Sequence, residues 1–261
     1  MLAEFLADRA AAEARRRGGP LVVGLTGPQG SGKTTLAAAL APLLARLGRR
    51  AAVLALDDLY LPRAERLRLA ADVHPLFATR GPPGTHDAAL GAAVLASLQR
   101  GGPTQIPSFD KGADDRRPAR DWSRLDGPFD VVIFEGWCVG ARPQPANALA
   151  RPVNALEREQ DPNGDWRAYA NDQLAGPYRA LFAPIGFQVL LRPPSFEVVL
   201  GWRRQQEVTL RTRGVGQSDA ELATFIQYYE RLTRWIDAEM PPRADVVAEL
   251  DPDRNARRLT P

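Results

Sequence analysis

The stretch VVGLTGPQGSGKTT, residues 22–35, indicates the fold of this protein. An apolar run is followed by a glycine-rich turn, and the pattern G-x-x-x-x-G-K-[ST] is met by Gly27, Gly32, Lys33 and Thr34. An apolar strand before such a turn and an amphipathic helix after it form the context in which this pattern binds phosphate groups. We therefore expect a phosphate-binding loop here.

Each residue type in this loop suits an anion. Glycines let successive backbone N–H groups converge on phosphate oxygens, and the N-terminus of the following helix adds a partial positive charge. Lys33 is expected to reach the β- and γ-phosphates of a nucleotide, and the Thr34 hydroxyl can bind Mg²⁺. The residues expected to contact the nucleotide are Gly27, Pro28, Gln29, Gly30, Ser31, Gly32, Lys33, Thr34 and Thr35.

Lysine is rare in this chain. Of its 34 basic side chains, two are lysine, Lys33 and Lys111, and the remaining 32 are arginine. A compact ammonium fits among phosphates where a planar guanidinium does not, so the lysine in the loop supports the phosphate interpretation. The same argument makes Lys111 a second candidate, although one lysine can also be incidental.

Composition places the chain among ordinary globular proteins. It has 261 residues, 44% apolar and 25% charged, with a net charge of +3. No stretch combines clustered basic residues with interleaved aromatics, so the sequence does not predict a nucleic-acid partner. No apolar run approaches the ~20 residues of a membrane span. The single cysteine, Cys138, suits a reducing compartment. Acidic residues precede basic ones in the N-terminal helix expected over 1–18, the reverse of a signal peptide, so we expect a cytoplasmic protein.

Short apolar runs alternate with helical patterns. The runs lie at 21–26, 51–56, 130–135, 187–191 and 245–250, and the helical patterns at 34–48, 87–102 and 219–240. The runs are near-continuous rather than alternating, which predicts strands covered on both faces. Strand alternating with helix predicts an α/β fold with a parallel sheet and helices on both faces.

Two of the apolar runs end in carboxylates. LDDLYLP places Asp57 and Asp58 at the carboxyl end of the second strand, and FEGW places Glu135 at that of the third. Open α/β sheets bind ligands at this edge. Asp57 could accept the proton of an attacking hydroxyl, and Glu135 could hold Mg²⁺ or orient the nucleophile, although either aspartate could instead cap a turn. The candidate metal ligands are Thr34, Asp57 and Glu135.

Four stretches resemble, in this order, the uridine kinase, pantothenate kinase and phosphoribulokinase group of P-loop kinases: GPQGSGKTT, LDDLYLP, TQIPSFDKGADDR and VVIFEGW. Within that group, RGPPGTHD (80–87), SFDKGADDR (108–116) and EGWCVGARP (135–143) are similar to the D-glycerate 3-kinase branch. WRRQQE (202–207), GVGQSDAEL (214–222) and the C-terminal DPDRN extend the resemblance, which covers residues 18 to 255.

This resemblance implies a three-layer P-loop NTPase kinase fold. It implies a five-stranded parallel sheet of order 2-3-1-4-5 and a single domain over 1–261, with a lid over 203–218. The proline- and asparagine-rich segment 142–170 is expected to be an ordered insertion near the site. The implied cofactors are ATP and Mg²⁺, and the implied reaction is transfer of the γ-phosphoryl group to a small-molecule hydroxyl.

The resemblance also implies roles for particular residues. Asp57 becomes the expected base, and Glu135 matches the acidic residue of FEG. Arg203, Arg211 and Arg213 of the lid are candidates for clamping the transferred group, with a solvated surface as the alternative.

A glycerate-like acceptor requires cations for its carboxylate and polar groups for its hydroxyls. The candidates are Asp58, Tyr60, His86, Lys111, Arg116, Trp137 and Arg142. Asp87, beside His86, can be an acceptor ligand or the N-cap of a helix.

Three functions remain open at this point. The first is a kinase for glycerate or a similar small hydroxy acid, acting as a monomer or homodimer without a nucleic-acid or membrane partner. The second is a nucleoside or pantothenate-type kinase, for which Tyr60, Phe109, Trp137 and Tyr178 could supply stacking aromatics. The third is a non-catalytic nucleotide switch, against which the acidic strand ends DD and FEG count because they suit an acceptor site.

Overall fold

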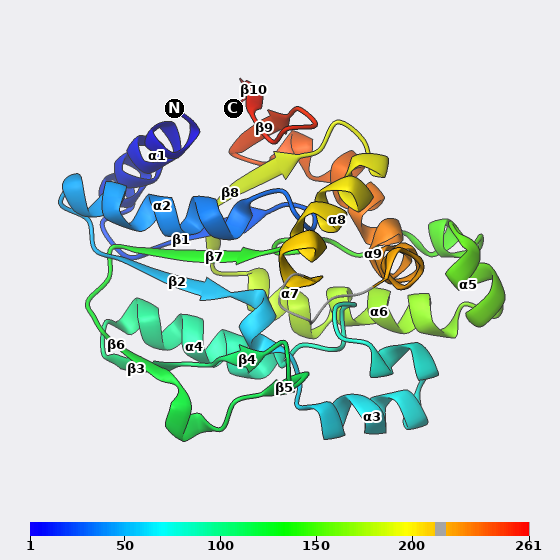
Figure 1. Ribbon diagram of the computed structural model, residues 1–261. Coiled ribbons are helices and arrows are strands. Elements are labelled where there is room, and N and C mark those ends of the chain that lie inside the picture. Colours follow the sequence, from blue (N-terminus) through cyan, green and yellow to red (C-terminus); the bar gives the residue numbers. More distant parts are fainter. Residues whose placement is uncertain (212–217, 261) are drawn as a thin grey trace.

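A six-stranded sheet of order β10-β9-β8-β1-β7-β2 forms the centre of the computed structural model, which describes residues 1–211 and 218–260 (Figure 1). Five of its strands are parallel: β1 (Leu21–Thr26), β2 (Ala51–Ala55), β7 (Val131–Gly136), β8 (Ile185–Arg192) and β9 (Val246–Leu250). Numbered along the chain, these five have the order 2-3-1-4-5, which confirms the prediction.

The sheet has one strand more than predicted. β10 (Ala256–Thr260) pairs antiparallel with β9 after a tight turn. In that turn the backbone N–H of Asp251 donates to the carbonyl of Asn255 at 2.9 Å, and the Asp251 carboxylate accepts from the Asn255 backbone N–H at 2.8 Å. Asp251 therefore closes the hairpin that returns the last residues to the sheet.

Consecutive residues of the central strands face opposite layers. Val22 and Val132 belong to one cluster of buried side chains, whereas Val23 and Ile133 belong to another. Helices α1 (Leu2–Arg17) and α2 (Lys33–Arg46) cover the second cluster, and the first lies under α4 (Ala88–Arg100), α7 (Pro177–Phe182) and α9 (Asp219–Glu239) (Figure 1). Burial on both sides explains why the strands are apolar throughout.

A long excursion of the chain separates β2 from β7. Its helical elements are η1 (Leu56–Leu59), α3 (Arg63–Asp72), η2 (Pro75–Ala78), α4 and η3 (Ala119–Asp121). Its strands form two small antiparallel pairs: β3 (Pro103–Ile106) with β6 (Ser123–Asp126), and β4 (Phe109–Asp110) with β5 (Asp115–Arg116). The β4–β5 hairpin returns Lys111 to η1, where its ammonium meets Asp57.

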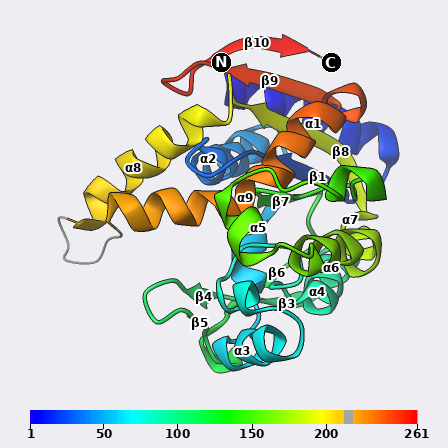
Figure 2. The same cartoon turned by 90° about the vertical axis from the view of Figure 1, so that its right-hand side faces the viewer.

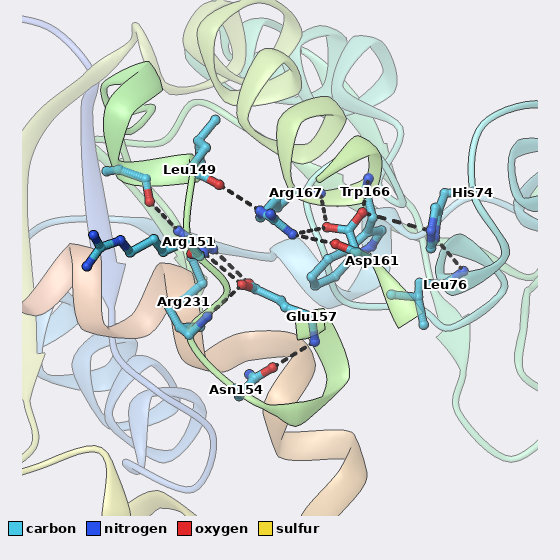
Figure 3. A network of polar contacts seen from close by, with 12 residues as sticks. His74, Leu76, Leu149, Arg151, Asn154, Glu157, Asp161, Trp166, Arg167 and Arg231 are labelled. Carbon is cyan, nitrogen blue, oxygen red and sulfur yellow. Dashed lines mark hydrogen bonds and ion pairs between the residues drawn. The ribbon is translucent and has the colours of Figure 1, made fainter. Parts of the chain in front are cut away.

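The segment after β7 is ordered and tied to α9. It contains η4 (Ala146–Leu149), α5 (Ala155–Gln160) and the start of α6 (Asp165–Ala175). Two buried carboxylates hold it, Glu157 paired with Arg231 of α9 at 2.7 Å and Asp161 paired with Arg167 at 2.9 Å (Figure 3). An unpaired buried charge would destabilise the fold by several kcal/mol, so each arginine is required where it lies.

The predicted helices are found with small shifts at their ends. α9 begins after Ser218, whose hydroxyl accepts from the backbone of Glu221 in a capping box. α2 ends at Arg46, before the predicted Gly48, which adopts a positive φ of 72° in the following turn. α8 (Glu197–Arg211) lies beside α9, and η5 (Pro241–Arg243) precedes β9 (Figure 2). No helix in the described ranges is both long and apolar enough to cross a membrane.

Candidate active site

The glycine-rich loop connects β1 to α2 at the carboxyl edge of the sheet. Gly30 and Gly32 have φ values of 76° and 88°, which residues with a Cβ rarely adopt. Ser31 is 4% exposed, and its hydroxyl has no hydrogen-bond partner among the described residues. Among the described residues, the ammonium of Lys33 makes one long hydrogen bond, to the carbonyl of Pro28 at 3.5 Å. The loop thus offers a hydroxyl and a cation that an anion can engage.

The back of this loop is held by residues that sequence analysis did not assign. A Cβ on Gly30 would lie 2.7 Å from the Cβ of Trp202 in α8, so only glycine fits there. Arg254 donates from Nε to the carbonyl of Gly30 at 2.6 Å and also pairs with Gln205 of α8. The motifs WRRQQE and DPDRN contain these residues, but only the folded chain brings them together behind the loop.

Thr34 and Glu135 meet at the end of the two central strands. The Thr34 hydroxyl donates to Oε1 of Glu135 at 2.8 Å, and the parallel register pairs Glu135 with Leu25, two residues before the loop. Burial raises the pKa of Glu135, while Lys33 and the Thr34 hydroxyl act in the opposite direction.

These two oxygens fit a magnesium ion. The described part of the chain has no group of three or more His, Cys, Asp or Glu side chains that could hold a metal by themselves. Mg²⁺ does not need such a group, because it commonly takes one or two protein oxygens and completes its shell with water and phosphate. Thr34 and Glu135 match that donor set, whereas Asp57 is paired with Lys111.

Asp57 lies in the short 3-10 helix η1 that follows β2. Residues three apart in a 3-10 helix share a face, and the Tyr60 hydroxyl accordingly donates to Oδ1 of Asp57 at 3.1 Å. The ammonium of Lys111 lies 2.6 Å from Oδ2. Burial raises the pKa of Asp57, but Lys111 and Lys33 together outweigh it and lower that pKa to about 2. Asp57 is therefore an ionised carboxylate at neutral pH.

His86 lies beside this carboxylate as a neutral ring. It stacks on Tyr60 with ring centroids 4.4 Å apart, and burial lowers its pKa to about 3. The Tyr178 oxygen accepts from the backbone N–H of Gly84 at 3.0 Å and lies 2.6 Å from Nδ1 of His86. A second backbone N–H, that of His86, donates to the same oxygen at 3.3 Å, so both lone pairs of Tyr178 are occupied and its hydroxyl donates its own proton to Nδ1. The ring proton of His86 therefore lies on Nε2. This buried Nε2–H has no partner within the described ranges.

Two predicted acceptor residues, Asp58 and Arg116, have polar groups that are bonded to other parts of the protein. Asp58 accepts from the backbone N–H of Phe109 at 3.1 Å and so holds the β4–β5 hairpin. Arg116 donates to the carbonyl of Tyr60 at 3.0 Å and pairs with Asp87 at 3.2 Å.

Trp137 is 3% exposed and donates from Nε1 to the carbonyl of Gly81 at 3.1 Å. Asp87 is the N-cap of α4 and accepts from the N–H of Leu90 at 2.9 Å, as the alternative interpretation of this residue expected.

Asp57, Tyr60, His86 and Lys111 form a cluster, here called the Asp57 cluster. The structure does not bring Arg142 to it. The loop after β7 turns back over the sheet, where Thr26 donates to the carbonyl of Val139 and Gly140 adopts a φ of 76°. Arg142 consequently lines a different cavity, between β8 and α7.

The predicted lid arginines lie in or after α8. Arg203 pairs with Glu207 at 2.5 Å, and its guanidinium lies 5.7 Å from the ring centre of Phe225 in α9. The side chain of Arg211 and the whole of Arg213 lie outside the described residues.

Arg80 is a cation near the cluster that sequence analysis did not select. It is the first residue of RGPPGTHD, pairs with Asp114, and lies 5.6 Å from the ring centre of Phe109. The same ring packs against Tyr60 in an edge-to-face arrangement, with centroids 5.1 Å apart. The motif RGPPGTHD could have pointed to Arg80. Its contact with Asp114 could not be predicted, because 34 residues separate the two in the sequence.

Comparisons with known proteins show which families the chain resembles. A family model described as "Methylmalonyl Co-A mutase-associated GTPase MeaB" matches residues 4–60, the part that contains the phosphate-binding loop. The chain is 36% identical over 222 residues to "Uncharacterized kinase mug58" of Schizosaccharomyces pombe, covering 81% of this chain and 79% of the relative.

Two further proteins carry the name D-glycerate 3-kinase. The chloroplastic enzyme of Arabidopsis thaliana is 31% identical over 256 residues, which cover 90% of this chain but only 54% of that protein's own length. The solved structure of the D-glycerate 3-kinase from Cryptococcus neoformans var. grubii has a TM-score of 0.83 at 29% identity, covering 100% of this chain and 99% of the other.

Proposed function

The chain belongs to the family of D-glycerate 3-kinase-like P-loop kinases, and from this premise we propose that it transfers the γ-phosphoryl group of ATP to a hydroxyl of glycerate or a similar small hydroxy acid. The observation that carries the proposal is the ionised carboxylate of Asp57, held 2.6 Å from Lys111 beside the phosphate-binding loop. A base can accept the proton of the reacting hydroxyl of a hydroxy acid, and a nearby cation can bind its carboxylate.

The loop residues support the nucleotide side of the reaction. Backbone N–H groups of 29–35 and the N-terminus of α2 favour the phosphate oxygens. The hydroxyl of Ser31, which has no hydrogen-bond partner among the described residues, adds a donor. Lys33 stabilises the negative charge that develops on the transferred group. Thr34 and Glu135 would hold Mg²⁺, which when bound neutralises charge on the phosphates.

Asp57 acts as the base in this proposal. Its carboxylate is ionised at neutral pH and can accept the proton of the acceptor hydroxyl as the new P–O bond forms. The Tyr60 hydroxyl fixes Oδ1 and therefore limits which carboxylate oxygen faces the acceptor. Lys111 contacts Oδ2 and is the group that can move to the carboxylate of an incoming hydroxy acid.

The acceptor side favours a small anion over a nucleoside. Lys111 and Arg80 supply positive charge there, and the Nε2–H of His86 supplies a neutral donor. A nucleoside would need an accessible aromatic face, yet the four candidates are 7% exposed or less and pack on protein groups: Tyr60, Phe109, Trp137 and Tyr178. The nucleoside alternative therefore lacks its stacking surface in the described residues.

A substrate screen tests the proposal directly. ADP release would be measured with D-glycerate, other small hydroxy acids, nucleosides and pantothenate, and each product identified by mass spectrometry and phosphorus NMR. We expect a phosphorylated hydroxy acid and no phosphorylated nucleoside. Phosphorylation of a nucleoside or pantothenate alone would overturn the choice of acceptor, and ATP binding without any phosphorylated product would favour the nucleotide switch.

A further inference from the structure

A cavity lies away from the phosphate-binding loop. It has a volume of about 650 Å³ and opens between α7, the start of β8 and the loop that follows β7. Cavities that bind small molecules typically have volumes of about 300–1,000 Å³. None of its lining residues belongs to the loop 27–35 or to the Asp57 cluster, so it is not an extension of the active site.

The charged groups around this cavity are unbalanced. Four arginines from four separate segments line it, and a single carboxylate, Asp245, faces them: Arg17, Arg142, Arg179 and Arg243. Asp245 already accepts from the backbone N–H of Gln188 at 2.7 Å. A concave surface with one sign of charge concentrates counter-ions more strongly than a flat one.

Two of the arginines are held in place by main-chain carbonyls. Arg17 donates to the carbonyl of Gly186 at 2.8 Å, and a Cβ at Gly186 would lie 2.3 Å from its guanidinium. Arg243 donates to the carbonyl of Gly140 at 2.7 Å. Each also has a glutamate partner on its own or an adjoining helix, Glu13 for Arg17 and Glu239 for Arg243.

The other two arginines lack an anionic partner. In the described part of the chain, neither guanidinium, of Arg142 or of Arg179, has an ion pair or side-chain hydrogen bond. Their backbones are nevertheless fixed, since the carbonyl of Arg142 accepts from Nε1 of Trp235 at 3.0 Å and Arg179 lies within α7. Solvated arginines are common on surfaces, but here two of them share one cavity with two that are already oriented.

We propose that this cavity is a second binding site, for a small molecule that carries at least two negative charges as carboxylate or phosphate groups. The planar guanidiniums of Arg142 and Arg179 can each bind such a group through two parallel N–H donors. Phe182, Ile185 and Phe187 provide an apolar floor for the carbon skeleton of the ligand.

Calorimetric titration tests the proposal with two probes, succinate for carboxylates and inorganic phosphate for phosphates. The protein is first saturated with Mg²⁺ and a non-hydrolysable ATP analogue, so that the phosphate-binding loop is occupied. We expect one saturable binding event per chain for at least one probe, weaker at higher salt because the contacts are ionic. The probe that binds identifies which anionic group the site prefers.

Variants separate this cavity from charge effects and from the acceptor site. Arg142→Ala with Arg179→Ala is expected to weaken binding at least about tenfold, or about 1.4 kcal/mol. The matched control, Arg158→Ala with Arg258→Ala, removes the same charge from exposed arginines elsewhere and should leave the affinity unchanged. Lys111→Met should also leave it unchanged.

Three results would overturn the proposal. They are no saturable binding of either probe up to about 10 mM, an equal loss of affinity in both double variants, or a loss confined to Lys111→Met. All four substituted arginines are exposed, so each variant is expected to fold, and its melting temperature checks this.

Discussion

The phosphate-binding loop and the Asp57 cluster lie at the same edge of the sheet but are built differently. The loop takes its groups from consecutive residues, 27–35, and in the described part of the chain the buried hydroxyl of Ser31 has no partner. The cluster takes its groups from distant segments, and its two main charges, Asp57 and Lys111, already bond to each other. The loop is therefore ready for its ligand, whereas the cluster must exchange an internal contact for one with the acceptor.

Removal of the loop cation should give the largest effect. Lys33→Ala is expected to lower kcat about 10³-fold, because the charge on the transferred group loses its nearest stabilising group. Lys33→Arg should not restore activity, since a guanidinium does not fit among the phosphates. Steady-state kinetics on variants with unchanged circular dichroism measure this. A kcat for Lys33→Ala near the wild-type value would remove the loop from the mechanism.

Asp57→Asn should have the next largest effect. The amide keeps the size of the side chain but cannot accept the proton, so kcat should fall about 10²-fold. The KM for ATP should stay close to the wild-type value, because the loop that binds the nucleotide is intact. An equal loss in kcat and in affinity for ATP would instead assign Asp57 to nucleotide binding.

Lys111→Met tests the exchange of partners by its effect on pH dependence. Burial raises the pKa of Asp57, and Lys111 and Lys33 lower it. Of these two lysines only Lys33 remains in the variant, so the pKa of Asp57 rises above its value of about 2. A protonated Asp57 cannot act as a base, so activity falls as the pH drops through that pKa. The acidic limb of kcat/KM should therefore move to higher pH than in the wild type.

The same variant should also raise the KM for the acceptor about tenfold, since a charged donor to its carboxylate is lost. Lys111→Arg keeps the positive charge and is the matched control for the pH profile. If the acidic limb of Lys111→Met coincided with that of the wild type, the ion pair would not set the protonation of Asp57.

Tyr60→Phe should give the smallest effect. It removes only the hydroxyl that donates to Asp57 at 3.1 Å, a loss of about 1 kcal/mol, or about fivefold in kcat. The buried ring still stacks on His86, so the melting temperature should change little. A loss as large as that of Asp57→Asn would mean that Tyr60 takes part in the chemistry rather than in orienting the carboxylate.

Sequence analysis succeeded where a function depends on neighbouring residues. The phosphate-binding loop follows from the spacing of Gly27, Gly32 and Lys33, and the parallel sheet follows from runs that are apolar on both faces. The helix predicted over 219–240 is found as α9, and the capping box that the structure shows at Ser218 is equally local, because the residues that form it are three apart. Such patterns are read directly from the chain, since backbone geometry fixes their spacing.

Sequence analysis was less informative where distant segments of the chain meet. Arg116 and Trp137 have the residue types of a binding site, but their donors bond to carbonyls of Tyr60 and Gly81. Arg142 follows the predicted edge in sequence, yet a turn at Gly140 carries it to another cavity. Residue type alone does not say whether a polar group is already satisfied by the protein.

The sequence by itself determined that this chain has a phosphate-binding loop, a parallel sheet, and carboxylates at the ends of its second and third strands. Tertiary structure alone decided that Lys111 meets Asp57, that the proton of neutral His86 lies on Nε2, and that four arginines share one cavity. The physical reason is one of range. Turns, caps and strand patterns depend on near neighbours, whereas pKa shifts and charge clusters depend on distances that exist only after the chain has folded.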